Sequence, residues 1–394
     1  MRLLHTSDWH LGRTLHGFSL SDAQARAVEA IVTTAIESQV DAVLVSGDVF
    51  DRAVPPVEAL RTLSDALTRL SAAGITVIIV AGNHDSGDRL GMYAGLLREG
   101  VHIVGSTDVV GDAVQLDDAY GPVLVYPVPY LDPDAARHEL GAPEAPLERS
   151  HEAVMRAALD EIEADLVGRG SPRAVVVGHA FVVPSATAEA DLAQFTSESE
   201  RDLTVGGVQV VPSSLFDGRG LTYVALGHLH RPQQLRCVDP VIAYSGSLLR
   251  YSLSEAGQQK TAVLVELGSP GTTPALTRVD LPPGRGMARL AGTMDALMGT
   301  ANLACRDDFV ELVVTDDVYP ERMHARLDSA FPFALVKRHR PRLAHSSPPG
   351  RGDSRGRDPL DVVADFLRKV TGREPSGAEA SVLRTVYESV RVAP

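Results

Sequence analysis

Cysteines and long apolar runs are both scarce in this sequence. Its 394 residues include two cysteines, Cys237 and Cys305, which excludes a disulfide framework and a cysteine-ligated metal site. The longest apolar stretch near the start is Ile75–Ala81, whereas a helix that spans a bilayer needs about 20 such residues. The opening sequence MRLLHTSDWH lacks the apolar core of a signal peptide. We therefore expect a cytoplasmic protein with no membrane partner.

Positive charge is also in short supply, with 37 basic against 51 acidic residues and a net charge of −14. This balance argues against a protein that holds nucleic acid by surface charge alone. One segment differs, because 337–357 contains seven lysines and arginines and a single acid, Asp353. A solvated linker and a nucleic-acid contact explain that segment equally well. No Walker A phosphate loop is present, so any dependence on ATP has to come from a partner.

The first 270 residues alternate short β-branched runs with helical patterns, which is typical of a layered α/β domain. The apolar spacing predicts helices over Val28–Gln39, Val57–Leu70 and His151–Val167. Glu198–Val211 is expected to contain a strand of a more antiparallel half.

Three further segments follow this domain. A Gly, Ser, Pro and Thr cluster at 268–273 predicts the first boundary, and 275–340 is expected to form a small α+β unit. Residues 341–357 are rich in Pro, Gly, Ser and Arg and predict a flexible basic linker. Residues 358–394 predict two amphipathic helices, the second capped by Ser376.

Five short apolar runs each end in residues of the types that bind metals. The five clusters are Asp8-Trp9-His10, Gly47-Asp48 with Asp51, Gly82-Asn83-His84-Asp85, Gly178-His179 and Gly227-His228-Leu229-His230. Taken singly, most of them are weak signals, and a lone Gly-His pair carries almost no information. Together, each at the end of a predicted buried strand, they indicate a two-metal hydrolase site at one edge of a sheet.

The residue types also limit the metal and the reaction. Asp8 and His10 are two apart, so both can reach one ion, and the two oxygens of Asp48 suit it to bridge two ions. A mixture of carboxylate, amide and imidazole ligands favours manganese, with iron or zinc as alternatives, and does not favour calcium or magnesium alone. We find no serine or cysteine placed to act as a nucleophile.

The clusters match, in order, the pattern D-x-H, G-D-x-x-D, G-N-H-[DE], G-H and G-H-x-H. In this the chain resembles the calcineurin-like metallophosphoesterases. More narrowly it resembles the SbcD-type nuclease subunits within that family, on the segments HTSDWHLGRTLHG, SGDVFDRAVPP, AGNHDS, ALGHLHRPQ and YSGSLLRYSLSEAGQQK. The resemblance implies an α/β fold, a two-sheet αββα sandwich followed by a small α+β capping domain that recognises DNA and by C-terminal helices.

The resemblance also implies a role for each cluster. The first metal would be held by Asp8, His10 and His230, and the second by Asn83, His179 and His228. Asp48 would bridge the two ions. His84 would face the scissile phosphate and stabilise its developing charge, and Asp85 would orient His84.

Three further residues are candidates for contact with DNA. Arg13 and His16 follow Leu11-Gly12 and could reach a substrate, although a solvated loop explains them equally well. Asp51 stands at about the place where archaeal and eukaryotic relatives have a histidine, so the DNA contact of that histidine cannot be transferred to it.

The family resemblance implies a function in DNA repair, replication and recombination. The chain would be the nuclease subunit of a complex that processes DNA ends and hairpins by two-metal hydrolysis of phosphodiesters. With an SbcC-type coiled-coil ATPase it would act as an ATP-dependent 3′→5′ exonuclease on double strands and as an endonuclease on single strands and hairpins. The alternative is a metal-dependent phosphodiesterase or phosphatase acting on small molecules or phosphoproteins.

Two surfaces are expected to bind protein partners. Val57–Leu70 and Leu90–Leu97 carry leucines suited to a homodimer within a heterotetramer. The helices of 358–394 are expected to dock on the coiled coil of the ATPase, with packing on the chain's own capping domain as the alternative.

Overall fold

The structure is a computed structural model that describes residues 1–92, 94–142, 144–185, 187, 192, 194–198, 210–235, 239–341 and 358–392. Cys237, most of the strand expected at 198–211 and nearly all of the predicted linker at 341–357 lie outside these residues. The chain divides into two compact units. The first contains residues 1–289, 304–311 and 331–335, and the second contains 290–303, 312–330 and 336–394.

The first sheet of the first unit has the strand order β16-β15-β1-β4-β5-β6. Four of its strands are parallel, namely β1 (Arg2–Thr6), β4 (Ala42–Ser46), β5 (Thr76–Val80) and β6 (Val101–Val104). Beyond β1 the sheet continues antiparallel with β15 (Thr261–Glu266) and β16 (Ala275–Asp280). The segment at 268–273, predicted as a boundary, therefore joins two paired strands of one sheet, and the first unit continues to Arg289.

The second sheet has the order β13-β14-β12-β9-β8-β7. Its parallel strands are β8 (Gly121–Val128), β9 (Arg173–His179), β12 (Tyr223–Gly227) and β14 (Val241–Tyr244). Its antiparallel edges are β7 (Val114–Asp118) and β13 (Gln233–Gln234). Smaller elements of this unit are the pairs β2 (Thr14–Leu15) with β3 (Phe18–Ser19) and β10 (Val182–Val183) with β11 (Val211–Pro212), and the short helix α3 (Gly87–Gly91).

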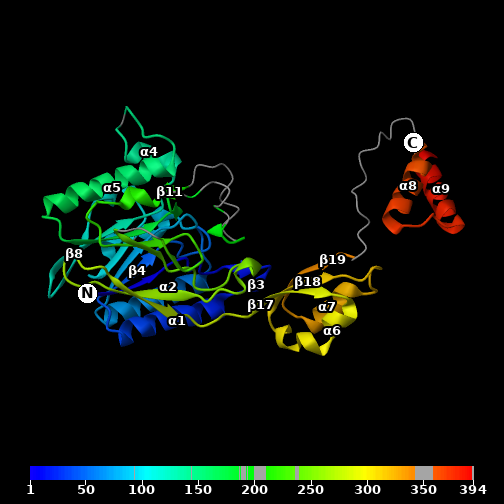
Figure 1. Cartoon of the computed structure of the whole chain (residues 1–394), viewed down its shortest axis with the longest axis horizontal. Coiled ribbons are helices and arrows are strands. Elements are labelled where there is room, and N and C mark those ends of the chain that lie inside the picture. Colours follow the sequence, from blue (N-terminus) through cyan, green and yellow to red (C-terminus); the bar gives the residue numbers. More distant parts are fainter. Residues whose placement is uncertain are drawn as a thin grey trace. The chain divides into compact units, whose positions relative to one another are not determined.

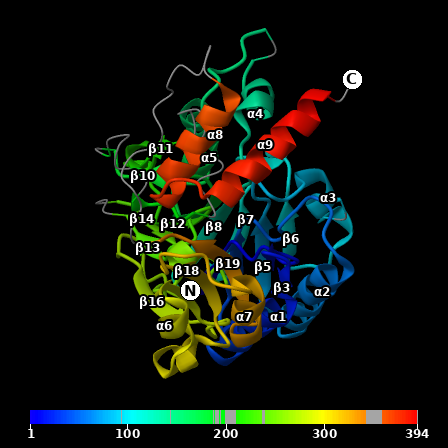
Figure 2. The same cartoon turned by 90° about the vertical axis from the view of Figure 1, so that its right-hand side faces the viewer.

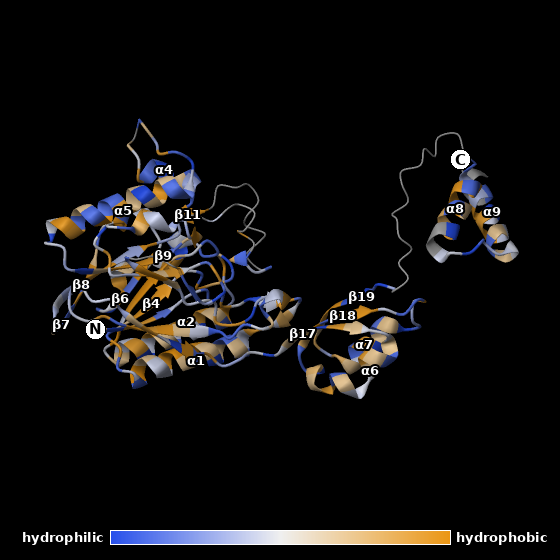
Figure 3. Cartoon of the chain, viewed as in Figure 1, coloured by the Kyte–Doolittle hydropathy of each residue, from blue (hydrophilic) through white to orange (hydrophobic). Residues whose placement is uncertain are grey.

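The alternation of side chains along each strand produces four layers. On β1 and β4, Leu3 and Leu44 face the second sheet, whereas Leu4 and Val43 face helices α1 (Ser21–Glu37) and α2 (Val57–Ala72). The outer face of the second sheet is covered by α4 (Pro133–Glu139) and α5 (His151–Gly168), on the opposite side of the unit (Figures 1 and 2). Each fully buried aliphatic side chain contributes about 1.5–3 kcal/mol. The αββα sandwich is confirmed, and Figure 3 shows its apolar strands enclosed between helices with polar outer faces.

Helix α1 begins earlier than predicted. It starts at Ser21 rather than Val28, because its first two turns bury alanine and glutamine instead of large apolar residues. The predicted helices at Val57–Leu70 and His151–Val167 are confirmed as α2 and α5. Ser150 caps α5 by accepting a hydrogen bond from the Ala153 amide at 3.1 Å.

The chain passes from the first unit into the second through a three-stranded sheet in the order β17-β18-β19. Its strands are β17 (Met287–Gly292), β18 (Phe309–Val314) and β19 (Ala334–His339). In the second unit α6 (Met294–Met298) lies against α7 (Met323–Ala330), with Leu297, Leu312 and Leu327 buried.

The C-terminal helices are α8 (Pro359–Thr371) and α9 (Gly377–Val392), and they pack against each other. Asp358 caps the first, Gly372 ends it with a left-handed φ of 70°, and Ser376 and Glu379 form the predicted capping box of the second. None of the helices in the described ranges combines the length and apolarity that crossing a bilayer requires.

Candidate metal centre

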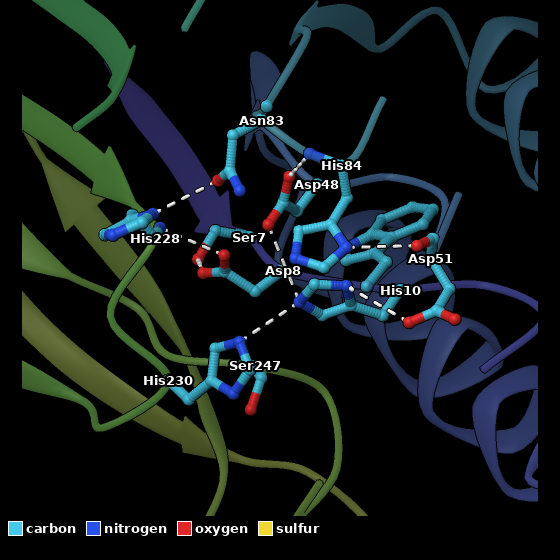
Figure 4. Close-up of polar contacts among 12 residues, drawn as sticks. Ser7, Asp8, His10, Asp48, Asp51, Asn83, His84, His228, His230 and Ser247 are labelled. Atoms are coloured by element: carbon cyan, nitrogen blue, oxygen red, sulfur yellow. Dashed lines mark hydrogen bonds and ion pairs between the residues drawn. The ribbon is translucent and has the colours of Figure 1, made fainter. Parts of the chain in front are cut away.

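The five clusters of metal-binding residue types lie together in the first unit, at the carboxyl ends of parallel strands. Three of them follow β1, β4 and β5 of the first sheet, and two lie at the ends of β9 and β12 of the second. The prediction of one sheet edge is therefore too narrow, because the site lies where the ends of two stacked sheets meet (Figure 4).

Backbone hydrogen bonds join the loops that follow β1 and β4. The amides of Asp8 and His10 donate to the carbonyls of Gly47 and Asp48, at 3.0 and 2.9 Å. Asp8, His10 and Asp48 have left-handed φ values of 51°, 44° and 51°. Each such residue costs about 1–2 kcal/mol, and strain of this kind gathers at functional sites.

Two glycines are required by close approach at this point. A Cβ on Gly47 would lie 2.3 Å from Nδ1 of His179, and one on Gly82 would lie 2.1 Å from Oδ1 of Asp48. The glycines that precede Asp48 and Asn83 therefore allow the strand ends to come together.

Asp48 occupies the centre of the site. Its Oδ2 lies 3.6 Å from Nε2 of His10 and 3.6 Å from Nε2 of His179. Its Oδ1 accepts a hydrogen bond from the His84 amide at 2.9 Å. One carboxylate thus faces imidazoles from both sheets, as a bridging ligand must.

The first group of donors combines Asp8, His10 and His230. The Nε2 atoms of His10 and His230 face each other at 3.0 Å, and potential ligand atoms of all three residues lie within 4.8 Å of one another. Asp8 is held from outside by the His228 amide (2.9 Å) and the Ser7 hydroxyl (2.5 Å). Burial raises the pKa of Asp8, and the neighbouring His179 and His230 oppose that shift.

The second group combines Asn83, His179 and His228. Oδ1 of Asn83 lies 2.9 Å from Nε2 of His179 and 3.2 Å from Nδ1 of His228. Burial and the neighbouring His179 hold the pKa of His228 well below its ordinary value, and burial does the same for His10. Neutral imidazoles keep a lone pair available for a metal.

Groups outside these two sets orient several of the imidazoles. Nδ1 of His179 is 2.9 Å from the Ser46 carbonyl, and Nδ1 of His84 is 3.0 Å from the Asp51 carbonyl. Nδ1 of His10 lies 3.8 Å from the Asp51 carboxylate and, among the residues described, has no hydrogen-bond partner. Hence Nε2 of His10 and His179 points toward the shared Asp48.

The donor set fits two divalent cations. Two carboxylates, one amide oxygen and four imidazole nitrogens meet in a buried space. A buried cluster of this kind needs positive charge to compensate its carboxylates. His84 also has a nitrogen within 4.8 Å of potential ligand atoms of His10 and Asp48.

Asp85 contacts other groups than predicted. Its carboxylate accepts backbone hydrogen bonds from Gly82 (2.9 Å), Val49 (3.0 Å) and Phe50 (2.9 Å), while the His84 ring is oriented by the Asp51 carbonyl. Burial and then Asp48 raise the pKa of Asp85 to about 6, against these three amides. Asp85 therefore joins the loops after β4 and β5, and its effect on His84 is indirect.

The three candidate DNA contacts lie in different environments. Nη1 of Arg13 is 3.2 Å from Oδ1 of Asp51, and its guanidinium lies over the Tyr251 ring at 5.0 Å. His16 is exposed between β2 and β3, apart from the metal-binding clusters. Asp51 is enclosed by the His10 ring and the Arg13 guanidinium, so a supporting contact explains it better than a solvated loop does.

Sequence analysis missed Gln24 and Tyr251. Nε2 of Gln24 donates to the His10 carbonyl at 2.6 Å, and the Tyr251 hydroxyl donates to the Trp9 carbonyl at 2.5 Å. Both hold the loop that carries Asp8 and His10. A glutamine on the buried face of α1 was the available signal, and the late predicted start of that helix hid it.

The family model described as "Calcineurin-like phosphoesterase" matches residues 1–232, more than half of the chain. The chain belongs to this family and is a metal-dependent phosphoesterase, as the five clusters predicted. It is also 29% identical over 396 aligned residues to the SbcD subunit of the nuclease SbcCD of Bacillus subtilis (strain 168), which covers 96% of this chain and 94% of the relative.

Two solved structures are similar to parts of the chain. One is TT1561 of Thermus thermophilus, at 17% identity and a TM-score of 0.42, covering 71% of this chain and 99% of that one. The other is a dimetal phosphatase from Danio rerio, at 15% identity and a TM-score of 0.41, covering 71% of this chain and 98% of that one.

Proposed function

We propose that the chain is the nuclease subunit of a cytoplasmic complex that processes DNA ends and hairpins. The carrying observation is the similarity to a nuclease subunit over 96% of the chain, which extends well beyond the 1–232 family match. The two-part cluster of donors at the sheet ends supports a phosphodiester as the substrate.

We infer that Asp8, His10 and His230 hold the first ion and that Asn83, His179 and His228 hold the second, with Asp48 shared. The mixture of oxygen and imidazole ligands favours Mn²⁺, with iron or zinc as alternatives. When bound, the two ions supply Lewis acidity at the phosphate and lower the pKa of the attacking water.

His84 is the proposed catalytic residue of the chain itself. Its Nδ1 is engaged by the Asp51 carbonyl at 3.0 Å, which leaves Nε2 for the substrate side. From there it can hydrogen-bond a phosphate oxygen as charge develops, and it can hold a proton for the leaving sugar oxygen. Its amide bond to Asp48 keeps the ring next to the shared carboxylate.

We further propose that the small α+β part of the second unit contacts DNA. Its strand β19 and the residue after it place Arg338 and Arg340 in exposed positions. Arginines of this kind can contact phosphates without reading the sequence, which suits a nuclease that acts on ends and hairpins.

The deciding experiment is a cleavage assay with Mn²⁺ and an end-labelled DNA hairpin, with and without an SbcC-type ATPase and ATP. We expect cleavage at the hairpin tip and 3′→5′ degradation of duplex ends that depends on ATP and the partner. No cleavage under any of these conditions, together with rapid hydrolysis of a cyclic nucleotide or phosphopeptide, would favour the alternative phosphodiesterase or phosphatase.

A further inference from the structure

Glu255 and Lys260 form a buried ion pair next to the first group of metal donors. Glu255 is 0% exposed and Lys260 4% exposed, and Nζ lies 2.6 Å from Oε2. The same Nζ donates to the His230 carbonyl at 2.8 Å. A buried pair of this kind gives little net stability compared with apolar residues of similar size, so its presence needs another reason.

The second oxygen of Glu255 faces the His230 ring. Oε1 lies 3.7 Å from Nδ1 of His230 and accepts hydrogen bonds from the hydroxyls of Ser252 (2.9 Å) and Ser197 (3.2 Å). At 3.7 Å the contact with Nδ1 is electrostatic rather than a short hydrogen bond. The opposite nitrogen of the ring, Nε2, is the one that faces His10 at 3.0 Å.

We propose that Glu255 is a positioning residue for His230 and that Lys260 is its countercharge. The carboxylate favours the tautomer with hydrogen on Nδ1, which directs the Nε2 lone pair toward the first metal position. The lysine holds both the carboxylate and the His230 backbone in this arrangement. This proposal deepens the proposed function and rests on its metal centre.

The second metal position lacks an equivalent carboxylate behind its His179 ligand. Nδ1 of His179 faces the neutral Ser46 carbonyl instead. A carboxylate behind a histidine ligand raises its basicity, and removing such a partner typically weakens metal binding about 10–100-fold. Loss of the Glu255 charge should therefore weaken one ion and spare the other.

The test is a calorimetric titration of the metal-free full chain with Mn²⁺, comparing Glu255→Gln with the unmodified protein. We expect two ions on the unmodified chain, and on Glu255→Gln one unchanged ion and one weakened about 10–100-fold. The visible absorption of bound Co²⁺ should change for the weakened site. Asp118→Asn is the matched control, because it breaks another buried ion pair, with Arg173, remote from the metal donors.

Unchanged affinity of both ions on folded Glu255→Gln overturns the proposal, as does an equal loss in Asp118→Asn. If Glu255→Gln does not fold, Ser252→Ala removes one hydrogen bond to the same oxygen and should weaken the same site by a smaller factor. Binding of a single ion by the unmodified chain contradicts the two-metal function. The positioning proposal is then decided by whether Glu255→Gln weakens that ion.

Discussion

At the scale of the residue, the site depends on which nitrogen of each imidazole points inward. Backbone carbonyls face the outward nitrogens of His179 and His84, and carboxylates lie behind His10 and His230. His84 differs from the others because its partner, Asp51, also lies next to the Arg13 guanidinium.

Replacing His84 with alanine tests its separation from the metal ligands. We expect His84→Ala to keep two bound ions and to lower the rate of DNA cleavage about 10²–10⁴-fold, the usual contribution of a proton-transferring side chain. Metal content by elemental analysis and cleavage rate are measured on the same preparation. His138→Ala, on the exposed surface of α4, is the control and should change neither. Loss of an ion from His84→Ala would make His84 a ligand instead.

At the scale of the element, the C-terminal helix pair carries apolar side chains that remain exposed. Val363, Phe366, Val382 and Val386 are 37–62% exposed along α8 and α9. We propose that these side chains dock on the coiled coil of the ATPase, as amphipathic helices do in a partner's groove.

Removal of 358–394 should abolish partner binding and leave metal-dependent cleavage of simple substrates intact. Phe366→Ala should weaken partner binding about 10-fold or more in a pull-down or calorimetric assay, because buried aromatic anchors carry much of an interface's energy. Val167→Ala, an exposed valine on α5, is the control. Partner binding by the truncated chain would refute the docking role.

A second exposed apolar surface lies on α2 and the segment around α3. Val57, Leu60, Met92 and Leu96 are 47–84% exposed, next to a groove of about 300 Å³ lined by Leu63, Leu67 and Leu97. A second copy of this chain is the proposed occupant, because exposed leucines of this size are costly in a monomer. Leu60→Glu should turn a dimer into a monomer in analytical ultracentrifugation, whereas Val167→Glu should not. A monomeric unmodified chain would contradict the dimer.

At the scale of the whole first unit, two sheets have to stay aligned for their strand ends to meet. Away from the metal donors, Arg173 of β9 pairs with Asp118 of β7 and donates to the Gly268 carbonyl, which follows β15 of the first sheet, at 2.8 Å. The Arg173 guanidinium holds the pKa of Asp118 well below its ordinary value. This pair therefore connects the two layers by charge as well as by packing.

Asp118→Asn should lower the free energy of unfolding on the order of 2 kcal/mol near neutral pH. A depressed carboxyl pKa stabilises the fold above the unfolded value, 3.8, and this contribution is lost as the pH falls through the lower folded value. The difference between variant and unmodified chain, measured by urea unfolding, should hold from pH 7 to about pH 4 and narrow below it. A difference that grows toward acid would contradict the assignment.

The sequence by itself determined the layered class, the five strand-end clusters and the residue types that receive a metal. These are local properties, because period-two alternation marks a strand and a glycine followed by Asp, Asn or His marks its end. His5 shows the same reach, since the expected packed core histidine is buried and hydrogen-bonded to Tyr223 at 2.9 Å.

Only the tertiary structure decided which groups lie behind those ligands. Asp85 binds three backbone amides rather than the His84 ring, Glu255 faces His230, and β16 completes a sheet past the expected boundary. Each contact joins segments that are distant in the chain or separated by a tight turn. Their distances depend on how two sheets stack, and that stacking follows from the burial of all the strands together, which local spacing does not contain.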